Sequence, residues 1–343
     1  MLETVKTLCS LSGVSSAEGE VRDYILTRVM PYADSITSDS AGNLIVFKKG
    51  AVTPAQKLLA CAHMDEVGLI VTGFRDDGSL RFGCVGGIDR RVLIGKRVFV
   101  GPERRLGVIG NKAIHLTSAD ERKKTPKVDD MYIDVGCRDE EDVKKVVSLG
   151  DICVFDDSIV EFGEGFLKAK AIDDRVGCAA MIKLIESELP CDVTFAFTVQ
   201  EEVGTRGAGV MSYAVAPDCA LILEGTTGTD LPDIDEGKVI CHAGDGVVIP
   251  FMDGGTMYDR GMYALLGRLA DENGIKHQTK RRIAGGTDAS AVQRSRAGVR
   301  VGAISCALRN IHSQSCIGKI SEFDDMLSLA SAFLKHFAEN GLE

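Results

Sequence analysis

The chain lacks the features that mark a membrane or a secreted protein. It has no Trp, and none of its apolar runs reaches the ~18 residues that a membrane-spanning helix needs. Residues 1–6 do not begin a basic stretch followed by an apolar one, as a secretory signal would. We therefore expect neither a transmembrane helix nor membrane partners.

Basic residues are also in short supply, with 40 Lys and Arg against 50 Asp and Glu, for a formal net charge of -10. Because neutralising phosphates requires a basic face, this balance argues against a nucleic-acid partner. The 11 cysteines include no Cys-x-x-Cys pair, and their number is odd. This favours reduced thiols that pack as small apolar groups in a cytoplasmic protein.

The 343 residues, 45% of them hydrophobic, suggest two domains or one large domain with an insert. From residue 67 to about 165, short apolar runs alternate with Gly and Asp turns, which is typical of a small β-barrel or sandwich. Within it we expect an exposed, charged loop at 119–128, a helix at 140–149 and a strand around His115, but no chemical site. A strand-and-helix pattern precedes this segment and resumes at Lys168, with one further possible strand at 239–243.

A pair of adjacent carboxylates, Glu201 and Glu202, follows an apolar run at 193–199 that is rich in β-branched and aromatic residues. The run predicts a buried strand. Burying two acids at its end is costly unless cations receive them, and open α/β sheets carry their chemistry at the carboxyl ends of strands. The alternative is a solvated turn with two surface acids, which describes most such pairs.

Similar polar groups lie at or just after other predicted strands. They are His63 and Asp65, Asp173 and Asp174, Glu224, and His312. Taken singly, each has a plainer interpretation, such as Asp173 or Asp174 capping a helix. Taken together, two imidazoles and several carboxylates suit two divalent ions such as Zn²⁺, Co²⁺ or Mn²⁺. An Asp shared between two ions can hold them at the ~3.5–4 Å separation of dinuclear hydrolases.

With these motifs in this order, the sequence resembles the TET-type dinuclear metallo-aminopeptidases, also called deblocking or glutamyl aminopeptidases. The resemblance covers nearly the whole chain and rests on five stretches: 62–68, 171–177, 200–204, 285–289 and 311–313. It implies an α/β fold of the zinc-peptidase type, with a mixed central sheet flanked by helices. It also implies an inserted PDZ-like β-barrel that serves dimerisation. The catalytic domain would then comprise residues 1–66 and 166–343, and the inserted domain residues 67–165.

The resemblance also implies roles for individual residues. The first metal ion would be held by His63, Asp173 and Glu224, and the second by Asp173, Glu202 and His312. Asp65 would orient the imidazole of His63, and Glu201 would be the general base. Many members of the family carry Asp where this chain has Glu224. Two divalent ions and three ligand carboxylates leave one positive charge, which a bridging hydroxide would match, since metal ions lower the pKa of water to about 7.

The expected function is a metal-dependent aminopeptidase that releases N-terminal residues from short peptides. The resemblance further implies dimers that assemble into a tetrahedral dodecamer. Three alternatives remain: a related dinuclear deacylase or carboxypeptidase, an endoglucanase as some relatives have been described, and a non-catalytic scaffold that assembles through its β domain. The preferred N-terminal residue and the native metal stay open.

Overall fold

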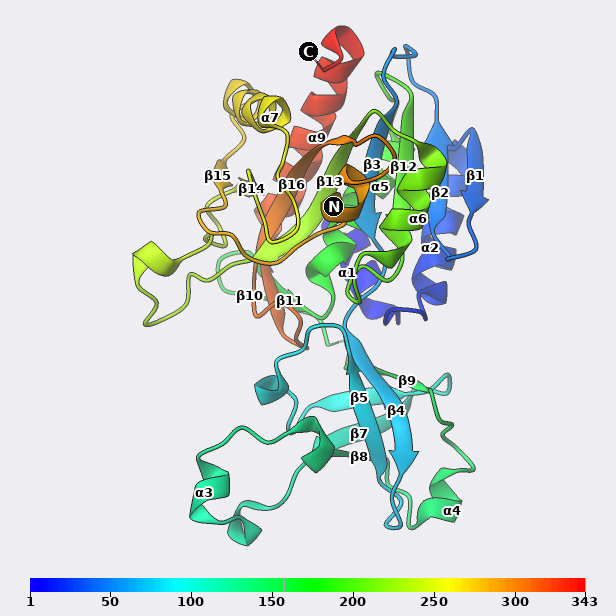
Figure 1. Ribbon diagram of the computed structural model, residues 1–343, viewed down its shortest axis with the longest axis vertical. Coiled ribbons are helices and arrows are strands. Elements are labelled where there is room, and N and C mark those ends of the chain that lie inside the picture. Colours follow the sequence, from blue (N-terminus) through cyan, green and yellow to red (C-terminus); the bar gives the residue numbers. More distant parts are fainter. Residues whose placement is uncertain (157, 343) are drawn as a thin grey trace.

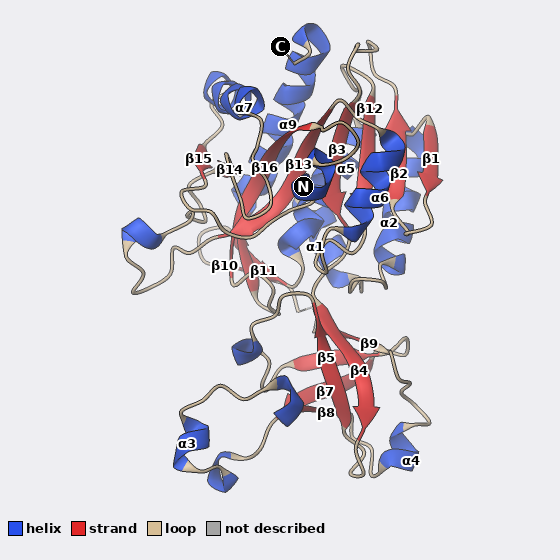
Figure 2. Cartoon of the chain, in the orientation of Figure 1, coloured by secondary structure: helices blue, strands red, loops and turns tan. Residues whose placement is uncertain are grey.

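The computed structural model describes residues 1–156 and 158–342, and it divides into a large α/β body above a small β body (Figure 1). The chain enters the lower body after β3 and returns to the upper body before α5, so residues from both ends of the sequence build the upper one. Figure 2 shows helices on both sides of the upper sheet, whereas the lower body consists mainly of strands and loops.

The upper body is built on an 11-stranded mixed sheet with the order β1-β2-β12-β3-β13-β16-β17-β11-β10, and β14 and β15 extend from β16. Its central strands β12, β3, β13 and β16 are parallel. The strands are β1 (Ser35–Ser38), β2 (Leu44–Lys48), β3 (Leu58–His63), β10 (Val160–Phe162), β11 (Phe166–Ala169), β12 (Val193–Thr198), β13 (Cys219–Thr227), β14 (Val247–Ile249), β15 (His277–Thr279), β16 (Arg300–Arg309) and β17 (Cys316–Lys319).

The central strands are buried on both faces, and this explains their nearly continuous apolar sequences. One face packs against α1 (Leu2–Ser10), α2 (Gly19–Val29), α5 (Ile172–Glu186), α7 (Arg260–Glu272) and α9 (Ile320–Asn340). The other packs against α6 (Arg206–Val215) and α8 (Ala289–Gln293). The buried side of α9 is an apolar stripe that runs from Phe323 to Phe337. No helix of the described residues is both long and apolar enough to cross a bilayer.

The lower body is a closed barrel with the strand order β4-β5-β8-β7-β6-β9. Its strands are β4 (Gly68–Phe74), β5 (Leu80–Val85), β6 (Arg97–Val100), β7 (Arg105–Gly110), β8 (Tyr132–Asp134) and β9 (Ile152–Phe155). The barrel has its own apolar core, which includes Leu69, Ile109, Ile133 and Phe155. The predicted mixed sheet with an inserted barrel is therefore confirmed. The last barrel strand is β9, because β10 pairs with β11 in the upper sheet.

Several local predictions were wrong or incomplete, in short segments where tertiary contacts decide the backbone. The helix expected at 140–149 is the single turn α4 (Glu140–Val143). The loop expected at 119–128 begins with the exposed turn α3 (Ala119–Arg122), stabilised by a capping box from Ser118. His115 lies in the 3₁₀ turn Ile114–Leu116 rather than in a strand. Residues 239–243 form no strand.

The approach of Gly50 to the backbone before β12 yields a test of the fold. A Cβ at Gly50 would lie 2.3 Å from the carbonyl carbon and oxygen of Cys191. Backbone atoms move little, so we expect Gly50→Ala to lower the free energy of unfolding by about 1–3 kcal/mol in denaturant titrations. The control is Gly209→Ala in α6, where a Cβ meets nothing within 4 Å. Helix propensity predicts that this change stabilises by up to ~1 kcal/mol, and equal effects of both substitutions would contradict the packing.

Candidate metal centre

The polar groups expected to form a site come together where the central parallel strands end. His63 is the last residue of β3, the pair Glu201 and Glu202 follows β12, and His312 follows β16. Asp173 lies in the first turn of α5. Glu224 lies inside β13, which continues to Thr227 rather than ending before this glutamate. Because adjacent parallel strands end at one edge of the sheet, residues far apart in sequence meet there.

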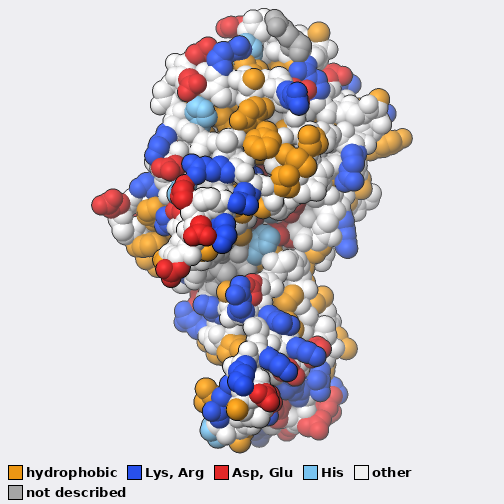
Figure 3. Space-filling model, turned by 60° about the vertical axis from the view of Figure 1, so that its left-hand side comes forward, with side chains coloured by type: hydrophobic (Ala, Val, Ile, Leu, Met, Phe, Trp, Pro, Cys, Tyr) orange, Lys and Arg blue, Asp and Glu red, His pale blue; other side chains and the backbone are white. Residues whose placement is uncertain are grey.

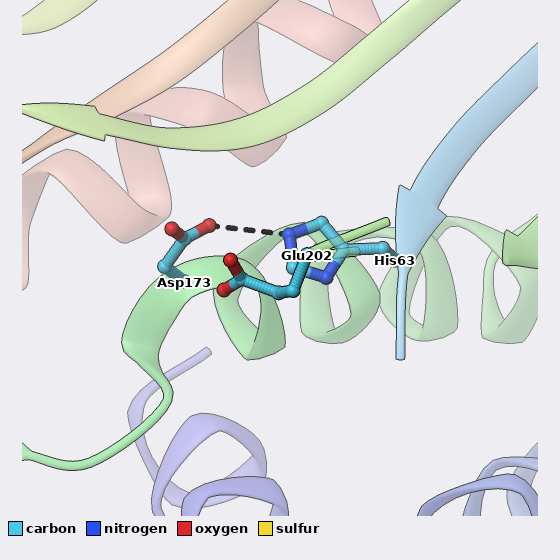
Figure 4. Close-up of side chains that lie close together, drawn as sticks. All are labelled: His63, Asp173 and Glu202. Carbon is cyan, nitrogen blue, oxygen red and sulfur yellow. Dashed lines mark ion pairs between the residues drawn. The ribbon is translucent and has the colours of Figure 1, made fainter. Parts of the chain in front are cut away.

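The side chains form two groups that share Asp173. Nε2 of His63 lies 3.3 Å from Oδ1 of Asp173 and 3.3 Å from Oε1 of Glu224. Nε2 of His312 lies 3.4 Å from Oδ2 of Asp173 and 3.2 Å from Oε2 of Glu202. Asp173 thus presents one oxygen to each imidazole. Figure 4 shows Asp173, Glu202 and the ring of His63 close together, with the Asp173–His63 contact dashed.

These residues fit divalent metal ions. Ligand atoms at about 2.0–2.1 Å from a tetrahedral ion stand about 3.3 Å apart, close to the separations in both groups. Oδ1 of Asp173 and Oε2 of Glu224 are buried and accept no hydrogen bond from the described residues. Leaving such oxygens without partners is costly. Asp174 also lies within reach of His63 and Glu224, but its oxygens accept the N–H groups of His63 and Gly177, so it supports the site instead.

Asp65 holds the site through both its backbone and its side chain. The Nδ1–H of His63 donates to the backbone oxygen of Asp65 at 3.0 Å, whereas the carboxylate lies 3.4 Å away. The carboxylate accepts the N–H groups of Glu201 at 2.9 Å and Glu202 at 3.1 Å, and the hydroxyl of Ser15 at 2.6 Å. Asp65 therefore makes the expected contact with His63. It also binds the backbone of Glu201 and Glu202, which the sequence did not reveal.

The barrel contributes one group to the site, although no chemistry was expected there. The Nδ1–H of His312 donates to the backbone oxygen of Gly87, in the turn after β5, at 2.9 Å. Such an acceptor fixes the tautomer and orientation of a ligand imidazole. A small recess of about 10 Å³ opens beside this contact, lined from the barrel side by Val67 and Phe155 and from the other by Asp173, Glu202 and His312, among others. The only hint in the sequence is the Gly86-Gly87 pair.

A second buried cluster, also missed in the sequence, lies next to the metal centre. The carboxylate of Glu66 accepts hydrogen bonds from Lys170 at 2.7 Å and from Arg175 at 3.0 Å. All three side chains are almost fully buried. Glu66 also accepts the N–H of Gly13, while Lys170 donates to the backbone oxygen of Leu11. The cluster ties the N-terminal segment to both sides of Asp173 and fixes where the shared carboxylate lies.

Backbone strain accompanies the site. Ala171, Gln200 and His312 all have positive φ, near 54–57°. This left-handed conformation is uncommon for residues other than glycine, and it recurs at functional sites. Each of these residues is a site residue or lies within two positions of one. The turns that aim the site side chains are therefore built by residues in an unfavourable conformation.

The acids of the site perturb one another's pKa values. Burial, together with the charge of Asp173, raises the pKa of Glu202 and of Glu224 to about 8. Burial lowers the pKa of His312, but Asp173 and Glu202 outweigh it and raise this pKa to about 9. Burial also raises the pKa of Glu201 well above its usual value. Without cations the centre therefore retains protons at neutral pH, which bound metal ions would replace.

An α/β body that gathers two imidazoles around a shared carboxylate at the ends of parallel strands defines a metallohydrolase. The sequence profile of the M42 glutamyl aminopeptidase family matches residues 42–329. The chain belongs to this family and is a metal-dependent aminopeptidase, which confirms the family resemblance seen in the sequence.

Characterised and inferred relatives match almost end to end. An aminopeptidase candidate from Acetivibrio thermocellus is 35% identical, over 96% of this chain and 97% of its own. The lysyl aminopeptidase of Pyrococcus furiosus is 30% identical, over 97% of this chain and 96% of its own. The glutamyl aminopeptidase of Lactococcus lactis is 29% identical, over 94% of this chain and 92% of its own. The lysyl enzyme is named for a basic residue and the glutamyl enzyme for an acidic one, and the two are about equally similar to this chain.

Solved structures confirm the architecture. Aminopeptidase APDkam598 from Desulfurococcus kamchatkensis superposes with a TM-score of 0.92 at 34% identity, covering 97% of this chain and 94% of its own. The TET1 peptidase of Pyrococcus horikoshii, described as assembling into a tetrahedron or a large octahedral shell, gives 0.84 at 33%, covering 97% and 98%. A Thermotoga maritima protein described as an endoglucanase gives 0.80 at 34%, covering 97% of both chains.

The raised pKa values predict how stability changes with pH in the metal-free protein. Glu202 and Glu224 release protons near pH 4.5 when unfolded but near pH 8 when folded. Between these values the folded state binds more protons, so stability falls as pH rises. His312, with its pKa raised from 6.5 to about 9, acts in the same direction. We expect the Tm of the chelator-treated protein to fall from about pH 5 to about pH 9, as followed by scanning calorimetry.

Adding Zn²⁺ should reverse this trend, because metal binding replaces the retained protons and grows stronger as pH rises. Calorimetric titration in buffers of different ionisation enthalpy should detect proton release on metal binding near pH 7. A metal-free Tm that rises over the same pH range, or metal binding without proton release, would contradict the electrostatics of the site.

Proposed function

We propose that the protein releases N-terminal residues from short peptides by using two divalent metal ions per subunit. The observation that carries this proposal is the arrangement of Asp173, which offers one oxygen to the group of His63 and the other to the group of His312. A carboxylate shared in this way is what a pair of ions needs if both are to act on one peptide bond.

In this proposal each ion has three protein ligands. His63, Asp173 and Glu224 would hold the first, and Asp173, Glu202 and His312 the second. Asp65 would keep the imidazole of His63 oriented. Bound ions supply Lewis acidity toward the peptide carbonyl and make water acidic enough to react near pH 7. The choice among Zn²⁺, Co²⁺ and Mn²⁺ depends on the first group, because Glu224 reaches further than the Asp common in the family.

Glu201 is suited to move the proton of the reaction. Its carboxylate lies beside the first group, with Oε2 4.0 Å from Nε2 of His63, and it accepts no hydrogen bond from the residues described. It is therefore free to take a proton from the attacking water and deliver it to the leaving amine. Burial raises the pKa of Glu201 above its usual value, which makes the carboxylate a stronger base. Asp65 accepts the backbone N–H groups of both Glu201 and Glu202. These bonds would hold the general base at a fixed position beside the metal ligand.

The assembly is also part of the proposal. By analogy with the tetrahedral assembly of the Pyrococcus horikoshii peptidase, the chain would form dimers through its barrel, residues 67–165, and these would form a dodecamer that admits only short peptides. Residues 1–66 and 166–343 would form the catalytic domain. Two apolar residues of the barrel, Ile114 and Leu116, are 73% and 64% exposed, as expected of a surface that a partner covers. We further propose a cytoplasmic location, with neither nucleic acid nor membrane as a partner.

Other hydrolase activities can be separated by substrate. A dinuclear deacylase or carboxypeptidase would prefer N-acyl or C-terminal substrates over unblocked peptides. An endoglucanase needs two opposed carboxylates and no metal, and here the acids surround two imidazoles. A panel of aminoacyl chromogenic substrates, assayed with Zn²⁺, Co²⁺ or Mn²⁺ returned to the metal-free protein, tests activity and metal preference together. Activity on cellulose that survives chelation, without release of amino acids, would overturn the proposal.

Replacing Glu201 by Gln tests the general base. The amide keeps the size of the side chain but does not accept a proton at neutral pH. We expect kcat to fall by roughly 10²–10⁴-fold, the usual contribution of general acid–base catalysis, while both metal ions remain bound by elemental analysis. Wild-type turnover in this variant would show that another group moves the proton.

Replacing His63 or His312 by Ala tests the ligand assignment. Each substitution removes the only imidazole from one group, so each should lower metal content by about one ion per subunit and abolish most activity. His115→Ala is the matched control, because His115 is an exposed residue of the barrel, remote from these groups. Unchanged metal content in both His63→Ala and His312→Ala would rule out the proposed ligands.

A further inference from the structure

Lys280 is a buried cation that lacks an acidic partner. It follows β15, and only 5% of its surface is exposed. Its Nζ donates to the backbone oxygen of Ala284 at 2.6 Å. Among the residues that the structure describes, no carboxylate oxygen lies within 4 Å of this nitrogen. The other buried lysine, Lys170, is paired with Glu66 at 2.7 Å.

The sheet register directs Lys280 toward the metal centre. Glu224 of β13 pairs with Ser305 of β16, which pairs with Val248 of β14, which pairs with Gln278 of β15. Paired residues face one side of a sheet, and every second residue along a strand returns to that side. Lys280, two positions after Gln278, therefore faces the side that carries Glu224.

Its neighbours support this placement. Thr279, one position earlier, points the other way and bonds Tyr263 of α7, which covers the opposite face. Burial lowers the pKa of Lys280, and the acids whose charges oppose this include Asp253, Glu224 and Asp173, two of them site carboxylates. In Figure 1 the yellow and orange segments that follow β14 and β15 pass in front of β13 and β16.

Of these acids Asp253 has the largest electrostatic influence on Lys280, but its oxygens bond to other groups of the chain. Oδ1 of Asp253 accepts the N–H groups of Gly255 and Thr256, and Oδ2 accepts the hydroxyl of Tyr258. Glu224 and Asp173 belong to the metal centre. Lys280 therefore makes no direct ion pair with the described residues. Because burying an ammonium without one is costly, a carboxylate brought in by a bound molecule would be stabilised there.

Basic side chains next to Lys280 do not share this role. Arg281 is exposed and pairs with Glu236, and Arg282 is exposed and donates to the backbone oxygen of Gly237. In Figure 3, acidic and His side chains are visible between the two bodies. Lys and Arg side chains lie above and below them on this face. Of this basic run, the buried member alone faces the site.

We propose that Lys280 determines the substrate specificity of the enzyme by binding the side-chain carboxylate of an acidic N-terminal residue, Glu or Asp. This inference rests on the aminopeptidase function proposed above. Family membership does not decide the point, because the lysyl and the glutamyl aminopeptidases are about equally similar to this chain. With the α-amino group and scissile bond at the metal centre, an acidic side chain would supply the counter-ion that Lys280 lacks.

The test compares kcat/KM for p-nitroanilides of Glu, Gln, Leu and Lys with the metal-loaded enzyme. A hydrogen bond between charged groups predicts that Glu exceeds its neutral isostere Gln by roughly 10- to 100-fold. Lys280→Met should bring this ratio close to one, mainly through the KM for Glu. Lys280→Glu should favour Lys instead, and Lys280→Arg should preserve the preference for Glu.

Lys276→Met is the matched control, since Lys276 is exposed, pairs with Asp245 and precedes the same strand. It should retain the wild-type ratio. Calorimetric binding of free L-glutamate and L-glutamine gives a second measure that does not need turnover. Cleavage of Gln or Leu as readily as Glu by the wild type, or an unchanged ratio in Lys280→Met, would overturn the role of Lys280 and leave the aminopeptidase proposal intact. Hydrolysis of none of the four substrates with any metal would overturn both.

Discussion

Mutual repulsion among buried acids is the constraint on which the site depends. Asp173, Glu202 and Glu224 lie within reach of two imidazoles in the same buried volume. Burial, together with the charge of Asp173, raises the pKa of Glu202 and of Glu224 to about 8. A fold tolerates such a cluster only if protons or cations neutralise it. The parallel strands create the constraint, because their carboxyl ends deliver polar residues from four separate segments to one edge.

Two further sets of contacts hold these side chains in place. The buried cluster of Glu66, Lys170 and Arg175 joins the N-terminal segment to the turn that carries Asp173. The barrel supplies the backbone oxygen of Gly87 to His312. The second group of the site is therefore completed by the inserted domain, so the barrel is more than an attachment for assembly: a shift of the barrel against the upper body would turn the ring of His312.

The sequence was sufficient to predict the strands, the inserted barrel and the residues that converge. Long apolar runs such as 193–199 leave little choice of structure, and polar groups at their ends are conspicuous. It did not reveal the oxygen of Gly87 or the bonds of the Asp65 carboxylate to the backbone of Glu201, because backbone groups carry no residue-specific signal. The partners of Glu66 were hidden as well, since a charge pattern along the chain does not show which charges are buried together. Short turns such as α4 were misjudged because local propensity there is weak.

The backbone next to Glu224 controls where its carboxylate lies. The backbone N–H of Gly225 donates to Oε1 of Glu224 at 3.1 Å, so the side chain folds back over its own strand instead of extending across the site. This leaves Oε1 3.3 Å from His63 and Oε2 without a protein donor. The next residue must then be small: a Cβ at Gly225 would lie 2.9 Å from Oδ1 of Asp173 and 2.7 Å from Leu308. Glu224 and the adjacent glycine therefore act as a pair, because the backbone N–H that holds the carboxylate belongs to a residue with no room for a side chain.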